Sequence, residues 1–226
     1  ITVGNNAIGI YGNEVNQSGN IMTGDNGVGI YSQRGEINLT GGTIKVGGKE
    51  AVGVYTSVIE TRMIKNSGTS FDIGDTSFGF VNIGNGGNTI ESKTTNITLS
   101  GNDSVYVYSN DNTSTVNNHS AITSTGATGG NYGIISAGTV NNDGNMTLTQ
   151  GIGNVGIYSN GSGIATNSAN IRVGASDPDN QKYSIGMAAG YKNDEDTTNP
   201  ATTGNVLNKG KISVDGKFGI GMYATN

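Results

Sequence analysis

One short string recurs along the whole chain, an apolar residue, a glycine, a second apolar residue and a tyrosine. Five copies are complete: Ile8–Tyr11, Val28–Tyr31, Val52–Tyr55, Val155–Tyr158 and Ile220–Tyr223. Three degenerate copies keep their glycine, at Gly79, Gly133 and Gly186, and one copy has Tyr106 in its place. Successive copies are 20 to 35 residues apart. A repeated unit of this length indicates a solenoid, in which each unit buries its apolar side chains against the next.

A second string precedes the later copies, and it places an Asn and a Gly before two alternating apolar residues, as in 140–148 and 206–214. Each unit therefore contains three short segments in which apolar and polar residues alternate, and Gly/Asn turns separate them. This alternation indicates half-buried strands, and the 39 glycines argue against helices. The sequence predicts an all-β, right-handed parallel β-helix of about nine rungs with three short strands per rung.

Stacked rungs place equivalent side chains above one another. We expect one inward apolar ladder, which consists of Ile30, Val54, Val107, Ile134, Ile157 and Met187. We also expect a buried ladder of turn asparagines, which consists of Asn66, Asn118, Asn142, Asn167 and Asn208. Strict alternation in the first copy places Ile8 and Ile10 inside and Gly9 and Tyr11 outside.

Charge and composition exclude several kinds of protein. The net charge is −5, and no cluster of Lys and Arg is present to bind nucleic acid. No apolar run approaches the length that spans a membrane, so we expect no membrane contact by this segment. The absence of Cys rules out disulfides and Cys-based zinc sites. We expect neither a metal nor a cofactor.

The chain begins and ends within the repeat pattern. We therefore expect residues 1–226 to be a single β-helix segment of a longer protein. Longer repeat units predict projecting loops near 57–65, 175–183 and 189–205. Loops that project from a rigid scaffold often carry function.

Tyrosines of the repeat are candidate binding residues, above all Tyr11, Tyr31 and Tyr55. If they lie outside the rod, they form an aromatic row on which sugar rings stack. The alternative is that the rings only cover a corner of each coil, and the replacement of tyrosine by Val81, Ile135 and Ala188 in other copies favours this alternative.

Acidic residues offer a second set of candidates. Four consecutive units carry an acid before the Gly-x-Tyr strand, at Asp25, Glu50, Asp75 and Asp103. In stacked rungs we expect these acids to form one negative column that binds a cationic partner or a divalent ion. The alternative is that they are solvated turn residues, because turns favour Asp.

Two predicted loops are also acidic. The candidates there are Asp177 and Asp179 in one loop and Asp194, Glu195 and Asp196 in the other. Such loops can bind Ca²⁺ weakly, but a solvated charged loop is the alternative.

No set of residues in the sequence indicates catalysis. His119 is the one histidine, and it lies in a turn, where a lone His is usually solvated. The Gly-x-Ser-x-Gly context of an activated serine is missing. We therefore expect no enzymatic activity.

The Gly-Ile-Tyr copies and the Asn-x-Gly-x-apolar turns resemble the passenger domains of large type V autotransporter adhesins, closest to the RadD-like passengers of fusobacteria. The resemblance covers nearly the whole chain. It implies display on the bacterial cell surface, anchoring in the outer membrane through a C-terminal translocator barrel outside this segment, and adhesion to a protein or glycan receptor on host or bacterial cells. The alternative function is a β-helix enzyme that processes glycans, in which several carboxylates and a basic residue should meet in one groove.

Overall fold

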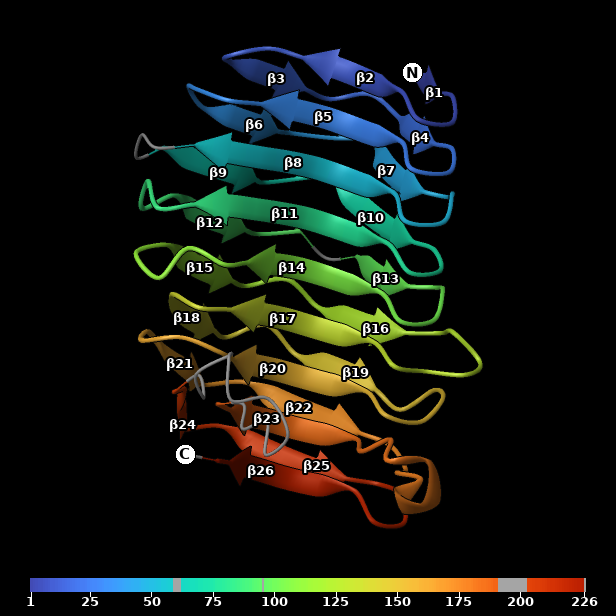
Figure 1. The fold of residues 1–226 in the computed structure, drawn as a ribbon, viewed down its shortest axis with the longest axis vertical. Coiled ribbons are helices and arrows are strands. Elements are labelled where there is room, and N and C mark those ends of the chain that lie inside the picture. Colours follow the sequence, from blue (N-terminus) through green and yellow to red (C-terminus); the bar gives the residue numbers. More distant parts are fainter. Residues whose placement is uncertain (59–61, 95, 191–202, 226) are drawn as a thin grey trace, which may run out of the picture.

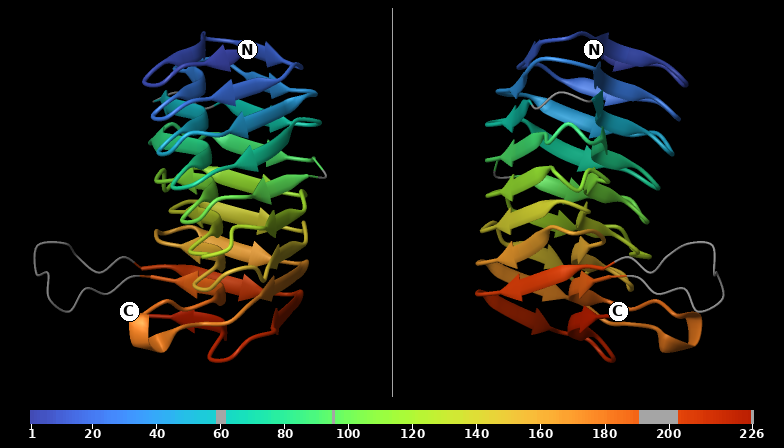
Figure 2. Two further views of the ribbon diagram at one scale, coloured as in Figure 1. Left: turned by 90° about the vertical axis from the view of Figure 1, so that its right-hand side faces the viewer. Right: turned by 60° about the vertical axis from the view of Figure 1, so that its left-hand side comes forward.

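The computed structural model describes residues 1–58, 62–94, 96–190 and 203–225. The chain winds into a parallel β-helix, and each turn of the helix adds one strand to each of three sheets (Figure 1). The sheets run along a rod with the two termini near opposite ends (Figure 2). The prediction of a parallel β-helix with three strands per rung is confirmed. The described residues contain no α-helix and one 3-10 helix, η1 (Pro178–Asn180).

Two sheets contain nine described strands and the third contains eight. The first sheet consists of β1 (Thr2–Val3), β4 (Ile21–Thr23), β7 (Thr43–Val46), β10 (Ser70–Ile73), β13 (Ile97–Leu99), β16 (Ile122–Ser124), β19 (Met146–Leu148), β22 (Asn170–Val173) and β25 (Lys211–Val214). The second sheet consists of β2 (Ile8–Tyr11), β5 (Val28–Ser32), β8 (Val52–Val58), β11 (Phe78–Gly84), β14 (Val105–Ser109), β17 (Tyr132–Ser136), β20 (Val155–Ser159), β23 (Ile185–Ala189) and β26 (Ile220–Ala224). The third sheet consists of β3 (Val15–Gln17), β6 (Ile37–Leu39), β9 (Met63–Asn66), β12 (Thr89–Ser92), β15 (Thr115–Asn118), β18 (Thr139–Asn142), β21 (Ile164–Asn167) and β24 (Asn205–Asn208).

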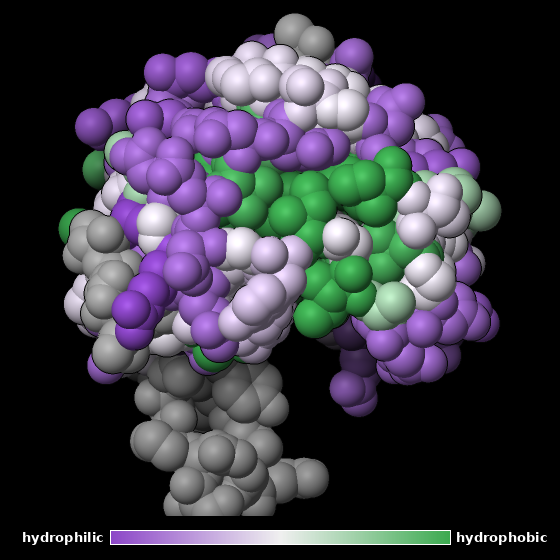
Figure 3. All heavy atoms as spheres, turned by 90° about the horizontal axis from the view of Figure 1, so that it is seen from above, coloured by the Kyte–Doolittle hydropathy of each residue, from purple (hydrophilic) through white to green (hydrophobic). Residues whose placement is uncertain are grey.

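The interior is one continuous apolar core that follows the axis of the rod. Viewed from the N-terminal end, apolar side chains fill the middle of the cross-section and polar ones surround them (Figure 3). The predicted inward ladder is confirmed: its members are fully buried and pair in register, and Phe80 completes it between Val54 and Val107. Burial of these side chains supplies most of the stability of such a fold.

Strict alternation fails in the second sheet. Ile10 packs against the core, but Ile8 is 50% exposed and points outward, so the prediction that Ile8 lies inside is wrong. Gly9 points inward instead, because a Cβ built on it would lie 2.6 Å from Cγ2 of the buried Val3. Gly9 and Ile10 are thus two successive inward residues, and Tyr11 points outward with 64% of its surface exposed.

The one copy of the repeat that lacks the glycine also has this position facing the interior. Tyr106 occupies the glycine position, is 0% exposed, and packs against the rings of Phe71 and Phe80 inside the rod. Its hydroxyl lies 2.6 Å from Oγ of Ser92, which is in turn 2.6 Å from Oγ of Ser120. Burial raises the pKa of Tyr106 to about 12, although these hydroxyls act in the opposite direction. The glycine position is therefore an interior position.

The asparagine ladder is confirmed for four of its five members. Nδ2 of Asn118 donates to Oδ1 of Asn142 at 2.7 Å, and the same contact joins Asn142 to Asn167 and Asn167 to Asn208. Asn66 is buried but is separated from the others by Ser92, and its amide closes its own turn with Thr69. The amides thus satisfy one another from rung to rung, which buried polar groups require.

The predicted loops are described to different extents. Residues 175–183 leave the rod and contain η1 (Figure 2). Residues 57–58 belong to β8 and 63–65 to β9, and the intervening residues 59–61 lie outside the described residues. Most of the loop near 189–205 also lies outside them.

Candidate functional site

The tyrosines of the repeat form a row on the outer face of the second sheet. Tyr11 is 64% exposed, and Tyr31 and Tyr55 are half-buried. The ring centroids of Tyr11 and Tyr31 are 5.4 Å apart and those of Tyr31 and Tyr55 are 5.3 Å apart, with interplanar angles of 50° and 64°. Each ring therefore packs against the next, and the row presents one aromatic surface rather than separate open ring faces.

A second outward column runs beside the tyrosine row, three residues earlier in each strand. The members of this column are Ile8, Val28, Val52, Phe78, Val105, Tyr132, Val155, Ile185 and Ile220. The tyrosine column consists of Tyr11, Tyr31, Tyr55, Val81, Tyr108, Ile135, Tyr158, Ala188 and Tyr223. We call these 18 residues the apolar face. None of them is charged, and all but Val81, Val105, Val155 and Ala188 are at least partly exposed.

The outer faces of the other two sheets mix charged residues with exposed apolar ones, such as Met22 on the first sheet and Ile164 on the third. The first sheet presents Lys45 and Asp72, whose charged atoms lie 3.9 Å apart, and Arg172, which pairs with Asp215. The third sheet presents a column in which Lys65, Glu91 and Asn117 follow one another. Charged side chains therefore lie on the outer faces of the first and third sheets, whereas none lies among the 18 residues of the apolar face.

The apolar face is hollowed at its C-terminal rungs. One hollow of about 330 Å³ lies over Ala188, where the tyrosine row is interrupted, and Tyr158 and Tyr223 border it. A neighbouring hollow of about 370 Å³ lies between Tyr223 and Tyr183, the latter supplied by the end of the 175–183 loop. The N-terminal rungs carry the continuous row of protruding rings, so the two halves of the face differ in relief.

The four acids expected to form one column divide between two stacks. Glu50 and Asp103 occupy the left-handed turn position, with φ near 54°, whereas Asp25 and Asp75 lie one residue earlier in their turns. Lys49 lies between Asp25 and Asp75, and its backbone N–H donates to Oδ1 of Asp25 at 2.9 Å. The expected single column is therefore wrong, because the position of the acid within the turn shifts by one residue between rungs. A cation-binding role for these acids stays a prediction.

One acidic loop is described. Oδ2 of Asp177 accepts a hydrogen bond from Nδ2 of Asn180 at 2.7 Å, and its side chain caps η1. That side-chain bond, with weaker help from the backbone and from Lys182, lowers the pKa of Asp177. Asp177 thus stabilises its own loop, and Asp179 lies in the first turn of η1. Asp194, Glu195 and Asp196 lie outside the described residues.

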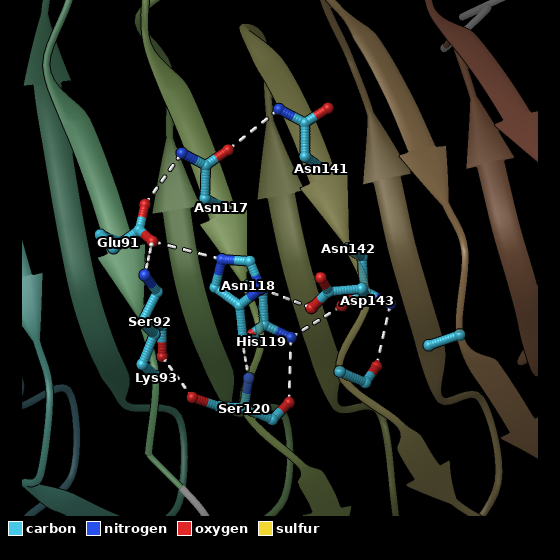
Figure 4. Close-up of polar contacts among 12 residues, drawn as sticks. Glu91, Ser92, Lys93, Asn117, Asn118, His119, Ser120, Asn141, Asn142 and Asp143 are labelled. Carbon is cyan, nitrogen blue, oxygen red and sulfur yellow. Dashed lines mark hydrogen bonds and ion pairs between the residues drawn. The ribbon is translucent and has the colours of Figure 1, made fainter.

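A charged cluster that the sequence did not reveal lies on the outer face of the third sheet (Figure 4). Nδ1 of His119 lies 2.6 Å from Oδ1 of Asp143, and Nε2 lies 3.2 Å from Oε1 of Glu91. Nζ of Lys93 lies 2.9 Å from the same Glu91 oxygen, and Nδ2 of Asn117 donates to Oε2 at 3.0 Å. We call Glu91, Lys93, His119 and Asp143 the charged cluster.

The electrostatics of the charged cluster depend on cross-rung contacts. Desolvation raises the pKa of Glu91, but hydrogen bonds from Lys93 and Asn117 and the charges of Lys93 and His119 outweigh it, so the pKa lies below its ordinary value. The two ring nitrogens of His119 contact Glu91 of the preceding rung and Asp143 of the following rung, so the cluster joins three successive rungs.

Comparison with known families gives one match. The model of the BigA third pectate lyase-like domain matches residues 11–226, which is nearly the whole chain. The chain belongs to this family. No curated protein and no solved structure matches it.

The charged cluster brings two carboxylates, a lysine and a histidine together. A hollow of about 440 Å³ lies beside it, lined in part by Met63, Lys65 and Glu91. Within the described ranges, no three His, Cys, Asp or Glu side chains are placed to hold a metal ion. In the same part of the chain, no helix is long and apolar enough to cross a membrane.

One signal in the sequence pointed to the charged cluster. Lys93, His119 and Asp143 each directly follow the last residue of a third-sheet strand, and Glu91 lies two residues before Lys93. Their spacings of 26 and 24 residues are the distances between the ends of successive third-sheet strands, at Ser92, Asn118 and Asn142. Alignment of the third strand of each unit, rather than of the Gly-Tyr strand, would have brought them together.

Proposed function

We propose that this chain is a surface-displayed segment of a bacterial adhesin, outside the cell and anchored in the outer membrane through other parts of the protein. The apolar face is the observation that supports this proposal. Exposed apolar patches of several hundred Å² on soluble proteins mark interaction sites, and this face extends over nine strands without a charge. The repeats that resemble RadD-like passengers and the family of the chain agree with a rod-shaped surface protein.

The proposed adhesion uses the apolar face to contact a protein or glycan on a host or bacterial cell. A rigid rod suits this task, because the face is held flat by pairing along its whole length and loses little conformational entropy when it binds. The net charge of −5 opposes contact with nucleic acid, and the partner is therefore a protein or a sugar.

Binding of the purified chain to host and bacterial cells tests this function. Tyr31→Glu places a charge in the middle of the tyrosine row, and we expect at least a tenfold loss of binding. The matched control is Met22→Glu, which makes the same kind of change at a residue of the same rung that is 46% exposed on the first sheet. Both variants should melt like the wild type. Equal binding by all three proteins would rule out the apolar face as the adhesive surface.

An enzyme that cleaves glycans is the second candidate, and the charged cluster favours it. Against it, both nitrogens of His119 and the oxygens of Glu91 already contact other side chains of the cluster or Asn117, which leaves them occupied in the free protein. We expect no release of reducing or unsaturated ends from pectate or from other acidic and neutral polysaccharides. Activity that disappears in His119→Gln would establish the enzyme instead.

A further inference from the structure

A third hollow, of about 320 Å³, adjoins the two hollows at the C-terminal rungs of the apolar face, and we call it the mixed hollow. Its apolar wall includes Tyr132 and Ile185 of the apolar face and Tyr183 from the end of the loop that contains η1. Asp103 and Lys182 also line it, whereas no charged residue lines the other two hollows. Apolar and charged side chains therefore meet at this one place on the face.

Two glycines keep the mixed hollow open. A Cβ built on Gly130 would lie 2.1 Å from Oδ1 of Asp103, and one built on Gly153 would lie 3.2 Å from Cβ of Lys182. Both glycines have a positive φ, 75° and 74°, which residues with a side chain rarely adopt. The carboxylate of Asp103 thus lies in space that a side chain at position 130 would fill.

The polar side chains of the mixed hollow are free to contact a ligand. Asp103, Gln181 and Lys182 are exposed, and in the part of the chain that the structure describes, no hydrogen bond or ion pair occupies their side-chain polar atoms. An ionised Asp only accepts hydrogen bonds, Lys only donates them, and Gln does both. A ligand group that both donates and accepts, such as a hydroxyl, matches this set.

Tyrosine rings lie next to these polar groups. Tyr132 is half-buried, and burial together with the negative charge of Asp103 raises its pKa. The carboxylate is therefore close to this ring and can act on the same ligand. Tyr183 is 40% exposed, so its ring also offers surface to a ligand. Tyrosine combines an apolar ring with a polar hydroxyl, which suits the apolar face and the polar edge of a sugar ring.

The mixed hollow is continuous with its two neighbours. It shares Tyr132 and Ile185 with the hollow over Ala188, and it shares Tyr183 and Ile185 with the hollow beside Tyr223. Together they extend from β17 to β26, four adjacent strands of one sheet, over about 14 Å. This elongated shape suits a chain of several rings better than a single small molecule.

The two opposite charges of the mixed hollow select an uncharged ligand. Asp103 repels an acidic sugar, and the net charge of −5 adds to that repulsion. Lys182 repels an amino sugar that carries a positive charge. Hydroxyl groups contact both side chains without such a cost.

We propose that the mixed hollow binds a neutral oligosaccharide. Hydroxyl groups of one sugar donate to Asp103 and accept from Lys182, the apolar side of its ring packs on Tyr183, and further sugars continue toward Tyr223. This inference rests on the proposed function, because it names the class of receptor for the same surface. A few convergent polar groups in a largely apolar hollow are typical of small-ligand sites.

Titration of the full chain with soluble tetrasaccharides tests the inference. The neutral probes are N-acetylated chitotetraose and lacto-N-neotetraose, and the charged probes are deacetylated chitotetraose and tetragalacturonate. The chain has no Trp, so ring contact should change its tyrosine fluorescence, and calorimetry measures the affinity. The wild type should bind at least one neutral probe with a Kd of about 1 mM or below. It should bind each charged probe at least about tenfold more weakly.

Two variants place the bound sugar in the mixed hollow. Tyr183→Ala removes the stacking ring and should weaken binding about tenfold. Asp103→Asn removes the charged acceptor and should also weaken it about tenfold, while Asn suits the left-handed turn position. The matched controls are Phe218→Ala, which removes a ring that is 69% exposed, and Glu14→Gln, which removes an exposed carboxylate. Both controls should bind like the wild type, and melting curves show that all four variants are folded.

Three results would overturn the inference. They are no binding of either neutral probe up to about 10 mM, equal binding of a charged probe, and unchanged binding by both Tyr183→Ala and Asp103→Asn. Cell binding by a chain that binds no sugar would leave the proposed function in place with a protein receptor. Sugar binding by a chain that binds no cells would leave the mixed hollow in place without the proposed function, so the two failures are distinct.

Discussion

The outer faces of the second and third sheets differ in charge, although the same rungs carry both. The face of the second sheet consists of aliphatic and aromatic columns, with the rings of Tyr11, Tyr31 and Tyr55 packed on one another. The face of the third sheet carries a polar column, in which Asn141 donates to Asn117 at 2.9 Å and Asn117 donates to Glu91. The interior behind both faces is the same apolar core with its asparagine ladder.

This difference shows that the interior and the outer faces have separate tasks. The ladders inside determine stability, because their side chains leave water entirely and satisfy one another. The outer faces make weaker contacts, so their composition is free to serve binding. Paired substitutions on one strand, one inside and one outside, test this division.

The largest expected effect is at the inward ladder behind the apolar face. Val107→Asp places an uncompensated charge at a fully buried position and should lower the free energy of unfolding by about 3–5 kcal/mol. The neighbouring Tyr108→Asp on the outer face should cost less than about 1 kcal/mol. Urea unfolding of both variants measures the difference, and equal losses would mean that the apolar face is part of the core.

The same comparison on the polar side uses two adjacent asparagines. Asn142→Ala leaves Oδ1 of Asn167 and Nδ2 of Asn118 without their partner inside the rod and should cost about 1–3 kcal/mol. Asn141→Ala removes only an exposed contact and should change stability by less than about 0.5 kcal/mol. Thermal melts decide between them, and a larger loss for Asn141→Ala would contradict the division.

The hydroxyl of Tyr106 allows burial in the interior to be tested by varying the pH. Its pKa in the folded chain, about 12, lies above the ordinary value of 10.0. The stability gained by keeping the hydroxyl neutral is therefore complete below pH 10 and is lost as the pH rises toward 12. Tyr106→Phe should cost about 1 kcal/mol at neutral pH. Its disadvantage should shrink above pH 10, and a constant difference between the two proteins up to pH 12 would show that the hydroxyl is not buried.

The smallest effect is expected in the charged cluster on the polar face. The pKa of Glu91 is lowered from its ordinary value of 4.5, so its contribution to stability is complete above that pH and is lost as the pH falls through the folded value. Glu91→Gln should cost about 0.5 kcal/mol at pH 7, because the cluster is partly solvated. The two unfolding curves should converge in acid, and a gap that persists at pH 2 would assign the effect to packing.

The candidate sites could be predicted from the sequence only in part. The sequence indicated that the tyrosines stack as a row but left the direction of the row open, and the structure places Tyr11 on the outside. The outward position of Ile8 did not follow, because the bend at Gly9 breaks the alternation and only contacts with Val3 reveal it. Asp25 precedes Gly29 by four residues and Glu50 precedes Gly53 by three, and this difference of one residue puts only Glu50 at the left-handed turn position.

The sequence by itself determined the rung, since period-two alternation and Gly/Asn turns are local signals that each unit repeats. It thereby determined the inward ladder and the asparagine ladder, whose members occupy the same place in every unit. The tertiary structure alone decided which side chains meet across rungs. His119 lies between Glu91 and Asp143, and the apolar face extends over a whole sheet, because stacking brings residues from different turns to one level. The turns differ in length, and spacing along the chain therefore does not give spacing along the rod.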